Sequence, residues 1–199
     1  MKSVRPAASV PPGYVAAFSG IASRIQATIL KAGKKAVLPV RMVVAGGAAV
    51  LFYTGTRVSL DIDATLSQRI LLPEQLESAY ADGDGAPRVL YFDRQYNDTY
   101  ALMHENAADD AHPLKLPGID PAVLDIRLLS PTDLAVSKLA RYADHDQDDI
   151  AALARHGLID ASGVRKRAEQ ALIAFVGETR RVKTSIRLAC ALIERQHQG

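Results

Sequence analysis

The sequence of 199 residues contains a single cysteine, Cys190, and no apolar run long enough to form a membrane helix. One cysteine excludes an internal disulfide framework and any zinc site that needs several cysteines. A membrane helix needs about 20 predominantly apolar residues, and the basic first residues are not followed by the apolar stretch and cleavage site of a signal peptide. We therefore expect a cytoplasmic protein without a membrane partner.

The sequence also lacks a strong overall charge, because 24 Lys and Arg nearly balance 22 Asp and Glu. The charges are unevenly placed, with acidic residues concentrated between 133 and 160 and basic residues between 165 and 187. A basic patch can hold nucleic acid or an acidic protein partner, but it can equally be the solvated face of a helix. The five histidines show none of the spacings typical of metal ligands.

Hydrophobic residues make up 48% of the chain, which is enough for a substantial core. In the first part of the chain, periodicity and turn residues predict a helix over 13–32, a strand over 37–45, a short helix over 48–53, a strand over 59–66, a helix over 73–81, strands over 88–93 and 99–103 joined as an antiparallel hairpin, and a strand over 123–129.

After Ser130 the pattern becomes entirely helical. Ser130 is a typical N-cap, followed by proline at the first helical position and an acid at the third. The helices that we predict here cover 131–143, 147–156, 162–176 and 179–196. The order of elements predicts an α+β fold, with a mixed sheet flanked by helices over 1–129 and a C-terminal helical region over 130–199.

Two carboxylates, Asp61 and Asp63, lie two residues apart within the predicted strand 59–66. Side chains at i and i+2 of a strand point to the same face, roughly 6.5 Å apart. Two acids on one face, with Leu60 and Ile62 on the other, are an expensive arrangement unless a cation lies between them. Magnesium suits such a pair, because it prefers hard oxygen ligands and is usually bound together with phosphates.

Two glycines, Gly46 and Gly47, stand at the predicted turn from a strand into a helix. Glycines at such a turn allow backbone N–H groups to approach a phosphate, and the helix N-terminus adds positive potential. A tight turn packed against the sheet would explain the two glycines equally well. The glycines followed by the acid pair, in this order and at this spacing, are far more specific than either feature alone.

The segments Gly46-Gly47-Ala48-Ala49 and Arg57-Val58-Ser59-Leu60-Asp61-Ile62-Asp63 resemble the signature of the nucleotidyltransferase superfamily, whose fold is polymerase-beta-like. Within it, the chain most resembles the AbiEii-like and minimal-nucleotidyltransferase toxins of bacterial toxin–antitoxin and phage-defence systems. The resemblance covers about residues 35–160, and its later part is the run from Leu128 to Leu139 followed by Asp146-x-x-Asp149.

This resemblance implies an enzyme that moves a nucleoside monophosphate from an NTP to a hydroxyl of tRNA or of a partner protein. It also implies a toxin that a neighbouring antitoxin holds in check. Gly46 and Gly47 would hold the triphosphate, and Asp61 and Asp63 would bind one or two magnesium ions, with manganese as an alternative. Such metals activate the attacking hydroxyl and neutralise charge on the departing pyrophosphate.

Three further residues receive a nucleotide-binding role from the resemblance. Arg57 and Ser59 flank the acids as they do in the family, although Ser59 can equally be a simple strand hydroxyl. Lys138 would reach the triphosphate as a point charge, unless it lies at the edge of a core face with only its ammonium in water.

Enzymes of the superfamily carry a third carboxylate on a later strand, and two residues are candidates here. Asp93 ends the predicted strand 88–93 and comes sooner in the topology. Asp125 is bracketed by apolar residues within the predicted strand 123–129, which is where an isolated acid most needs a functional reason. We favour Asp93 and keep Asp125 as the alternative.

Two other functions remain open. A non-catalytic module that keeps the fold and binds a nucleotide or a protein would be favoured if the third carboxylate were missing. A metal-dependent phosphodiesterase or nuclease would use the same acids to direct water. Three tyrosines, Tyr91, Tyr96 and Tyr100, could stack on a base, but packing in the core or in the hairpin is the role that we expect for them.

Overall fold

The computed structural model describes residues 4–56, 58–98 and 101–198 and divides the chain into two compact units. The first unit consists of Met1–Tyr96 and His112–Leu128, and the second of Asn97–Ala111 and Leu129–Gly199. The segment 97–111 thus belongs to the second unit, whereas the predicted domains, 1–129 and 130–199, are continuous in sequence.

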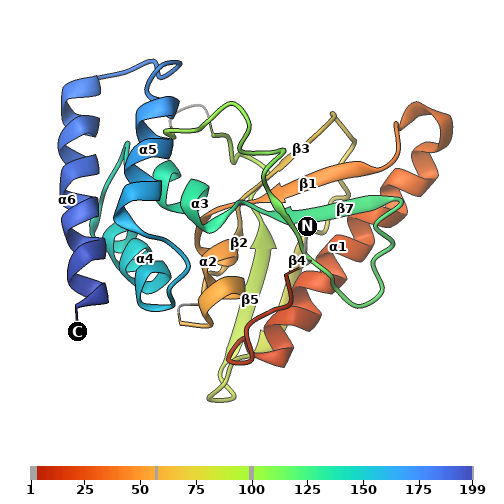
Figure 1. The fold of residues 1–199 in the computed structure, drawn as a ribbon. Coiled ribbons are helices and arrows are strands. Elements are labelled where there is room, and N and C mark those ends of the chain that lie inside the picture. The colour runs from red at the N-terminus through yellow and green to blue at the C-terminus, as the bar shows by residue number, and fades with distance from the viewer. Residues whose placement is uncertain (1–3, 57, 99–100, 199) are drawn as a thin grey trace. The chain divides into compact units, whose positions relative to one another are not determined.

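The described residues of the first unit form two sheets, with strand orders β3-β1-β7-β6 and β2-β5-β4. In the first sheet β1 pairs antiparallel with β3 and parallel with β7, and in the second β5 pairs parallel with β2 and antiparallel with β4 (Figure 1). This mixture of sheets and helices confirms the α+β prediction. The elements of this unit are α1 (Pro12–Ala32), η1 (Gly33–Lys35), β1 (Val40–Val44), α2 (Gly46–Thr54), β2 (Asp61–Ile62), β3 (Ala64–Leu66), β4 (Glu77–Ala81), β5 (Pro87–Phe92), β6 (His112–Pro113) and β7 (Leu124–Leu128).

The core of the first unit forms around the apolar face of α1, which packs on β4 and β5. The ring of Phe52 from α2 meets Tyr14 and Phe18 edge to face, with ring centroids 5.8 and 5.1 Å apart. Burial of each such aromatic side chain contributes about 1.5–3 kcal/mol relative to exposure. The predicted helix 13–32 is therefore confirmed. Its apolar residues recur at helical spacing, and they form the face that this core buries.

The predicted helix over 73–81 is wrong, and so is the predicted hairpin of 88–93 with 99–103. Residues 77–81 form β4, which pairs with β5 through the turn at 82–86. Tyr80 points into the core while Ala79 and Ala81 are exposed, a period of two that is typical of a half-buried strand. Residues 101–103 are not in a strand, and Thr99 and Tyr100 lie outside the described residues.

The second unit is helical. Its elements are α3 (Pro131–Ser137), α4 (Asp144–Arg155), α5 (Ala161–Ala171) and α6 (Thr179–His197). The predicted N-cap is confirmed, because the Ser130 hydroxyl accepts a hydrogen bond from the Asp133 N–H at 3.1 Å. The predicted helix 131–143 is too long, since α3 ends at Ser137 and Tyr142 has a positive φ of 51°. None of the helices in the described part of the chain has the length and apolar character to span a membrane.

Candidate active site

The strand that carries Asp61 and Asp63 is divided between the two sheets of the first unit. β2 ends at Ile62 and β3 begins at Ala64, so that Asp63 lies between them. The side chains still alternate, because Ile62 and Ala64 are buried whereas Asp61 and Asp63 are partly exposed. The two carboxylates therefore share one face, as the spacing predicts.

Backbone hydrogen bonds show what lies on either side of this strand. The carbonyl of Ile62 accepts the N–H of Asp93 at 3.1 Å, and the carbonyl of Asp63 accepts the N–H of Ala45 at 2.8 Å. Successive carbonyls of an extended chain point to opposite edges. Asp93 at the end of β5 and Ala45 at the end of β1 therefore flank the acid pair on opposite sides.

The register of β5 brings Asp93 and Tyr91 to the acid pair. Tyr91 is the direct neighbour of Asp61, and Asp93 follows beside Asp63, on strands about 4.8 Å apart. The side chain of Tyr91 is 45% exposed rather than packed in the core. The charge of Asp61 raises the pKa of Tyr91, and partial burial and the charges of Asp93 and Asp63 add to the effect. The phenol thus lies in the electrostatic field of three carboxylates.

Asp125, the other candidate for the third carboxylate, lies in a different environment. It is on β7, which β1 separates from β3. Its Oδ2 is 2.7 Å from Nε of Arg127 and 3.9 Å from Nε of Arg41. These two guanidinium groups account for a carboxylate among apolar neighbours without any catalytic role.

The glycine turn lies against Asp63, the second acid of the pair. Gly46 is the first residue of α2 and has a positive φ of 59°, and a Cβ at this position would overlap the Asp63 carboxylate. Gly47 follows in the first turn of the same helix, where backbone N–H groups have no partner within the helix. Because of its positive φ and its closeness to Asp63, position 46 accepts only glycine at this turn from β1 into α2.

Ser59 supports the first acid of the pair. Its side chain is 5% exposed, and its hydroxyl donates to Oδ1 of Asp61 at 2.5 Å. This hydrogen bond restricts the orientation of the Asp61 carboxylate, as outer-shell partners of metal ligands commonly do. Arg57, which the sequence also places in the site, lies outside the described residues.

The donor atoms at this site fit magnesium bound together with a substrate. Within residues 4–56, 58–98 and 101–198, no group of three or more His, Cys, Asp or Glu side chains is arranged to hold a metal ion alone. Magnesium in enzymes is usually bound by one or two carboxylates, with waters and substrate phosphates completing the octahedron. Asp61 and Asp63 supply such a pair of hard oxygen ligands on one face.

Lys138, the predicted triphosphate ligand, lies in the second unit and is only 8% exposed. Its Nζ is 2.7 Å from Oδ2 of Asp149 and 3.7 Å from Oδ1 of Asp146. Arg141 donates two further hydrogen bonds to the Asp146 carboxylate, at 2.8 and 2.7 Å. These contacts give Lys138 a structural function, which is to neutralise acids buried at the start of α4.

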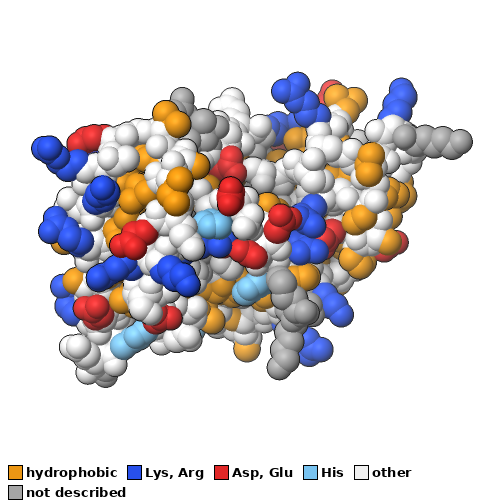
Figure 2. Space-filling model, turned by 45° about the horizontal axis from the view of Figure 1, so that its top comes forward, with side chains coloured by type: hydrophobic (Ala, Val, Ile, Leu, Met, Phe, Trp, Pro, Cys, Tyr) orange, Lys and Arg blue, Asp and Glu red, His pale blue; other side chains and the backbone are white. Residues whose placement is uncertain are grey.

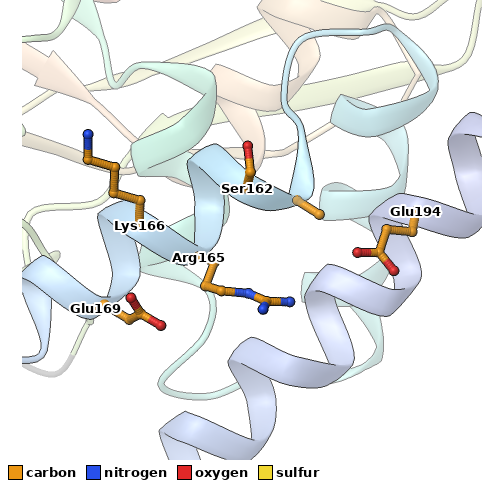
Figure 3. Close-up of a pocket in the computed structure, with 6 residues that line it drawn as sticks. Ser162, Arg165, Lys166, Glu169 and Glu194 are labelled. Atoms are coloured by element: carbon orange, nitrogen blue, oxygen red, sulfur yellow. The ribbon is translucent and has the colours of Figure 1, made fainter.

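The second unit has a cavity of about 310 Å³ between α5 and α6 (Figure 3). Its walls carry both signs of charge, so that it favours neither an anion nor a cation. Its lining consists of Ala161, Ser162, Arg165, Lys166, Glu169 and Glu194. Figure 2 shows Lys and Arg side chains interspersed with Asp and Glu on the helices of this unit, which is typical of solvated helix faces.

Two features of the site are not predicted from the sequence. Tyr91, expected in the core or in hairpin packing, stands on the face of the acids. Its position two residues before Asp93 in a strand is the signal that could have indicated this, because i and i+2 share a face. The contact of Gly46 with Asp63 has no comparable signal, since it depends on how β1 and β3 pair.

Comparison with known proteins assigns a family to the chain. A family model described as a nucleotidyltransferase of unknown function (DUF6036) matches residues 23–196. No curated protein and no solved structure gives a match.

Proposed function

The chain belongs to this family of nucleotidyltransferases, and on that premise we propose that it transfers a nucleoside monophosphate from an NTP to a hydroxyl group with the help of magnesium. The observation that carries the proposal is the arrangement of three residues around Asp63. Gly46 contacts the Asp63 carboxylate from one side, Asp93 lies beside it on the other, and Asp61 shares its face.

Each of these residues has a distinct task in the proposed reaction. The N–H groups at Gly46 and Gly47 would bind the triphosphate, because unpaired N–H groups at a helix start attract anions. Asp61 and Asp63 would hold the metal, and Ser59 would orient Asp61. Magnesium or manganese, when bound, would supply neutralisation of the phosphate charge.

In the chemical step, the acceptor oxygen forms a bond to the α-phosphorus as the bond from that phosphorus to the pyrophosphate oxygen breaks. Pyrophosphate leaves, and the proton of the acceptor hydroxyl passes to Asp93 or to a water beside it. Asp93 suits this task because it flanks the acid pair on the side opposite to the glycine turn, where the nucleophile of an in-line displacement must lie.

For the biological role we propose a cytoplasmic toxin of a toxin–antitoxin or phage-defence system, with tRNA or a protein as acceptor and an antitoxin as partner. The resemblance of the segments at 46–49 and 57–63 to AbiEii-like proteins supports this finer proposal.

The test is to incubate the protein with each labelled NTP, with magnesium or manganese, and with RNA or protein acceptors. With the native chain, label should be transferred to an acceptor. Asp61→Asn and Asp63→Asn should lower the rate of this transfer by at least about 100-fold. Asp93→Asn should be affected similarly, and Asp125→Asn much less. Asp84→Asn, a change at an exposed carboxylate of the β4–β5 turn, is the matched control and should retain activity.

Two outcomes would replace the proposal. Binding of NTP without any transfer would indicate a non-catalytic nucleotide-binding module. Release of labelled products from nucleic acid by water, with no pyrophosphate formed from NTP, would indicate a phosphodiesterase.

A further inference from the structure

A cavity of about 600 Å³ adjoins Asp93 in the first unit. It lies where β5 ends, alongside β3 and the loop that follows it. The residues that line it come from β3 with its following loop and from the end of β5, and they are Ala64, Thr65, Leu66, Ser67, Gln68, Arg69, Ile70, Leu72, Phe92, Asp93, Arg94 and Tyr96. Its volume is in the range of sites that hold a small molecule or one nucleotide residue.

The position of this cavity relates it to the acceptor rather than to the NTP. The acid strand has β1 and the glycine turn on one side and β5 with Asp93 on the other, as the carbonyls of Asp63 and Ile62 show. In an in-line displacement the nucleophile and the leaving group lie on opposite sides of the phosphorus. With the triphosphate at Gly46, the nucleophile approaches from the side of Asp93.

The lining combines a cation with apolar surface. Arg69 is exposed, and its guanidinium makes no hydrogen bond or ion pair with any residue that the structure describes. Arg94, by contrast, is fixed, because it donates to the backbone carbonyls of Pro73 and Glu74. Half-buried Tyr96, Ile70 and Leu72 add aromatic and apolar surface to a wall that also carries polar side chains.

This combination fits one class of acceptor better than another. A nucleotide presents a phosphate, which pairs with a guanidinium, and a base, which lies on aromatic or apolar surface. The hydroxyl of a serine or tyrosine in a protein brings no anion that would need Arg69.

We propose that the cavity beside Asp93 is the acceptor subsite and binds the terminal nucleotide of a single-stranded RNA, with Arg69 on its phosphate. The proposal rests on the proposed nucleotidyl transfer and names the acceptor for it. The 3′-hydroxyl of the bound nucleotide then lies next to Asp93, and the adjoining phosphate lies next to Arg69.

The experiment measures binding of a short fluorescent RNA with a free 3′-hydroxyl by anisotropy, in the absence of NTP, to the native chain and to two variants. Arg69→Gln should weaken binding about tenfold and reduce the slope of log K against log salt by about 0.7, the value for one phosphate contact on a single strand. Arg88→Gln is the matched control, because Arg88 is an exposed arginine of β5 that pairs at 2.9 Å with Asp82 of the β4–β5 turn. It should bind RNA like the native chain.

A parallel assay of NMP transfer separates this proposal from the one on which it rests. If RNA binding depends on Arg69 but neither the native protein nor a variant transfers NMP, the proposed RNA subsite is supported and the proposed nucleotidyl transfer is contradicted. If transfer occurs while Arg69→Gln leaves RNA binding and the KM for RNA unchanged, the subsite is overturned and nucleotidyl transfer stands. The RNA subsite would also be overturned if Arg69→Gln raised only the KM for NTP, or if the native protein transferred NMP to protein and not to RNA.

Discussion

Gly46 lies against the carboxylate of Asp63 so closely that a methyl group at Gly46 would overlap it. The backbone of Gly46 is also in the left-handed region, with a φ of 59°. Both conditions are met only by glycine, because other residues pay about 1–2 kcal/mol in this region and bring a Cβ. The start of α2 and the Asp63 carboxylate are therefore packed directly against each other, and a change in one displaces the other.

Gly46→Ala should lower the free energy of unfolding by more than the backbone term of about 1–2 kcal/mol and should displace Asp63, with loss of magnesium-dependent NTP binding. Gly118→Ala is the matched control, because Gly118 has a φ of 74° and nothing within 4 Å of the added Cβ. Gly118→Ala should lower the free energy of unfolding by the backbone contribution alone, about 1–2 kcal/mol, and should bind NTP normally. Urea unfolding and calorimetric titration with NTP measure both effects, and equal behaviour of the two variants would contradict the role of the contact.

Ser59→Ala should weaken the apparent affinity for magnesium about 10–100-fold, since it removes the hydroxyl that orients Asp61. The measurement is NTP binding or NMP transfer as a function of magnesium concentration. Ser185→Ala removes an equally buried hydroxyl, 5% exposed, from α6 of the second unit and serves as the control. An unchanged magnesium dependence in Ser59→Ala would show that Asp61 needs no such support.

Lys138→Met should destabilise the protein by about 3–5 kcal/mol, because it leaves the carboxylates of Asp149 and Asp146 buried without the ammonium group. The double variant Lys138→Met/Asp149→Leu should recover part of this loss, which urea unfolding can measure. NTP affinity, measured where Lys138→Met is folded, should equal that of the native chain. Weaker NTP binding there would instead support the triphosphate role suggested by the resemblance.

The stability of the protein should decrease in acid through Asp146. Burial opposes ionisation of this carboxyl, but the hydrogen bonds from Arg141 and from the Ala143 N–H and the charge of Lys138 outweigh it, so that its pKa lies below the usual value. The unfolded chain, with an Asp pKa near the usual value of about 3.9, then takes up the proton first as the pH falls. The contribution of Asp146 is therefore complete at neutral pH and is lost as the pH falls through its lowered pKa.

Asp146→Asn should accordingly be less stable than the native chain at pH 7, and the difference should shrink below about pH 4. Urea unfolding at a series of pH values measures this difference. Asp148→Asn changes an exposed carboxyl of the same helix and should show little difference from the native chain at any pH. A difference for Asp146→Asn that stays constant down to pH 2 would contradict the assignment.

The spacing of apolar residues along the chain correctly predicts those helices that bury a single apolar face in the core. The helices α1 and α6 follow from the helical spacing of their apolar residues, and the start of α3 follows from Ser130. The segment 73–81 was predicted wrongly, because Pro73 and the Asp-Gly turn suit the ends of a helix and the turn of a hairpin alike. Pairing of β4 with β5 decided between them, and that pairing is not encoded within the segment.

The sequence by itself determined the chemistry that the site can offer: two carboxylates at i and i+2, a hydroxyl on the same face, and two glycines at a strand-to-helix turn. These features depend on spacing along one strand, which the chain carries locally. Only the tertiary structure decided that Asp93 stands beside Asp63 while Asp125 pairs with Arg127, and that Gly46 contacts Asp63. The reason is that strand order and register join residues distant in sequence, and burial of the whole core selects them.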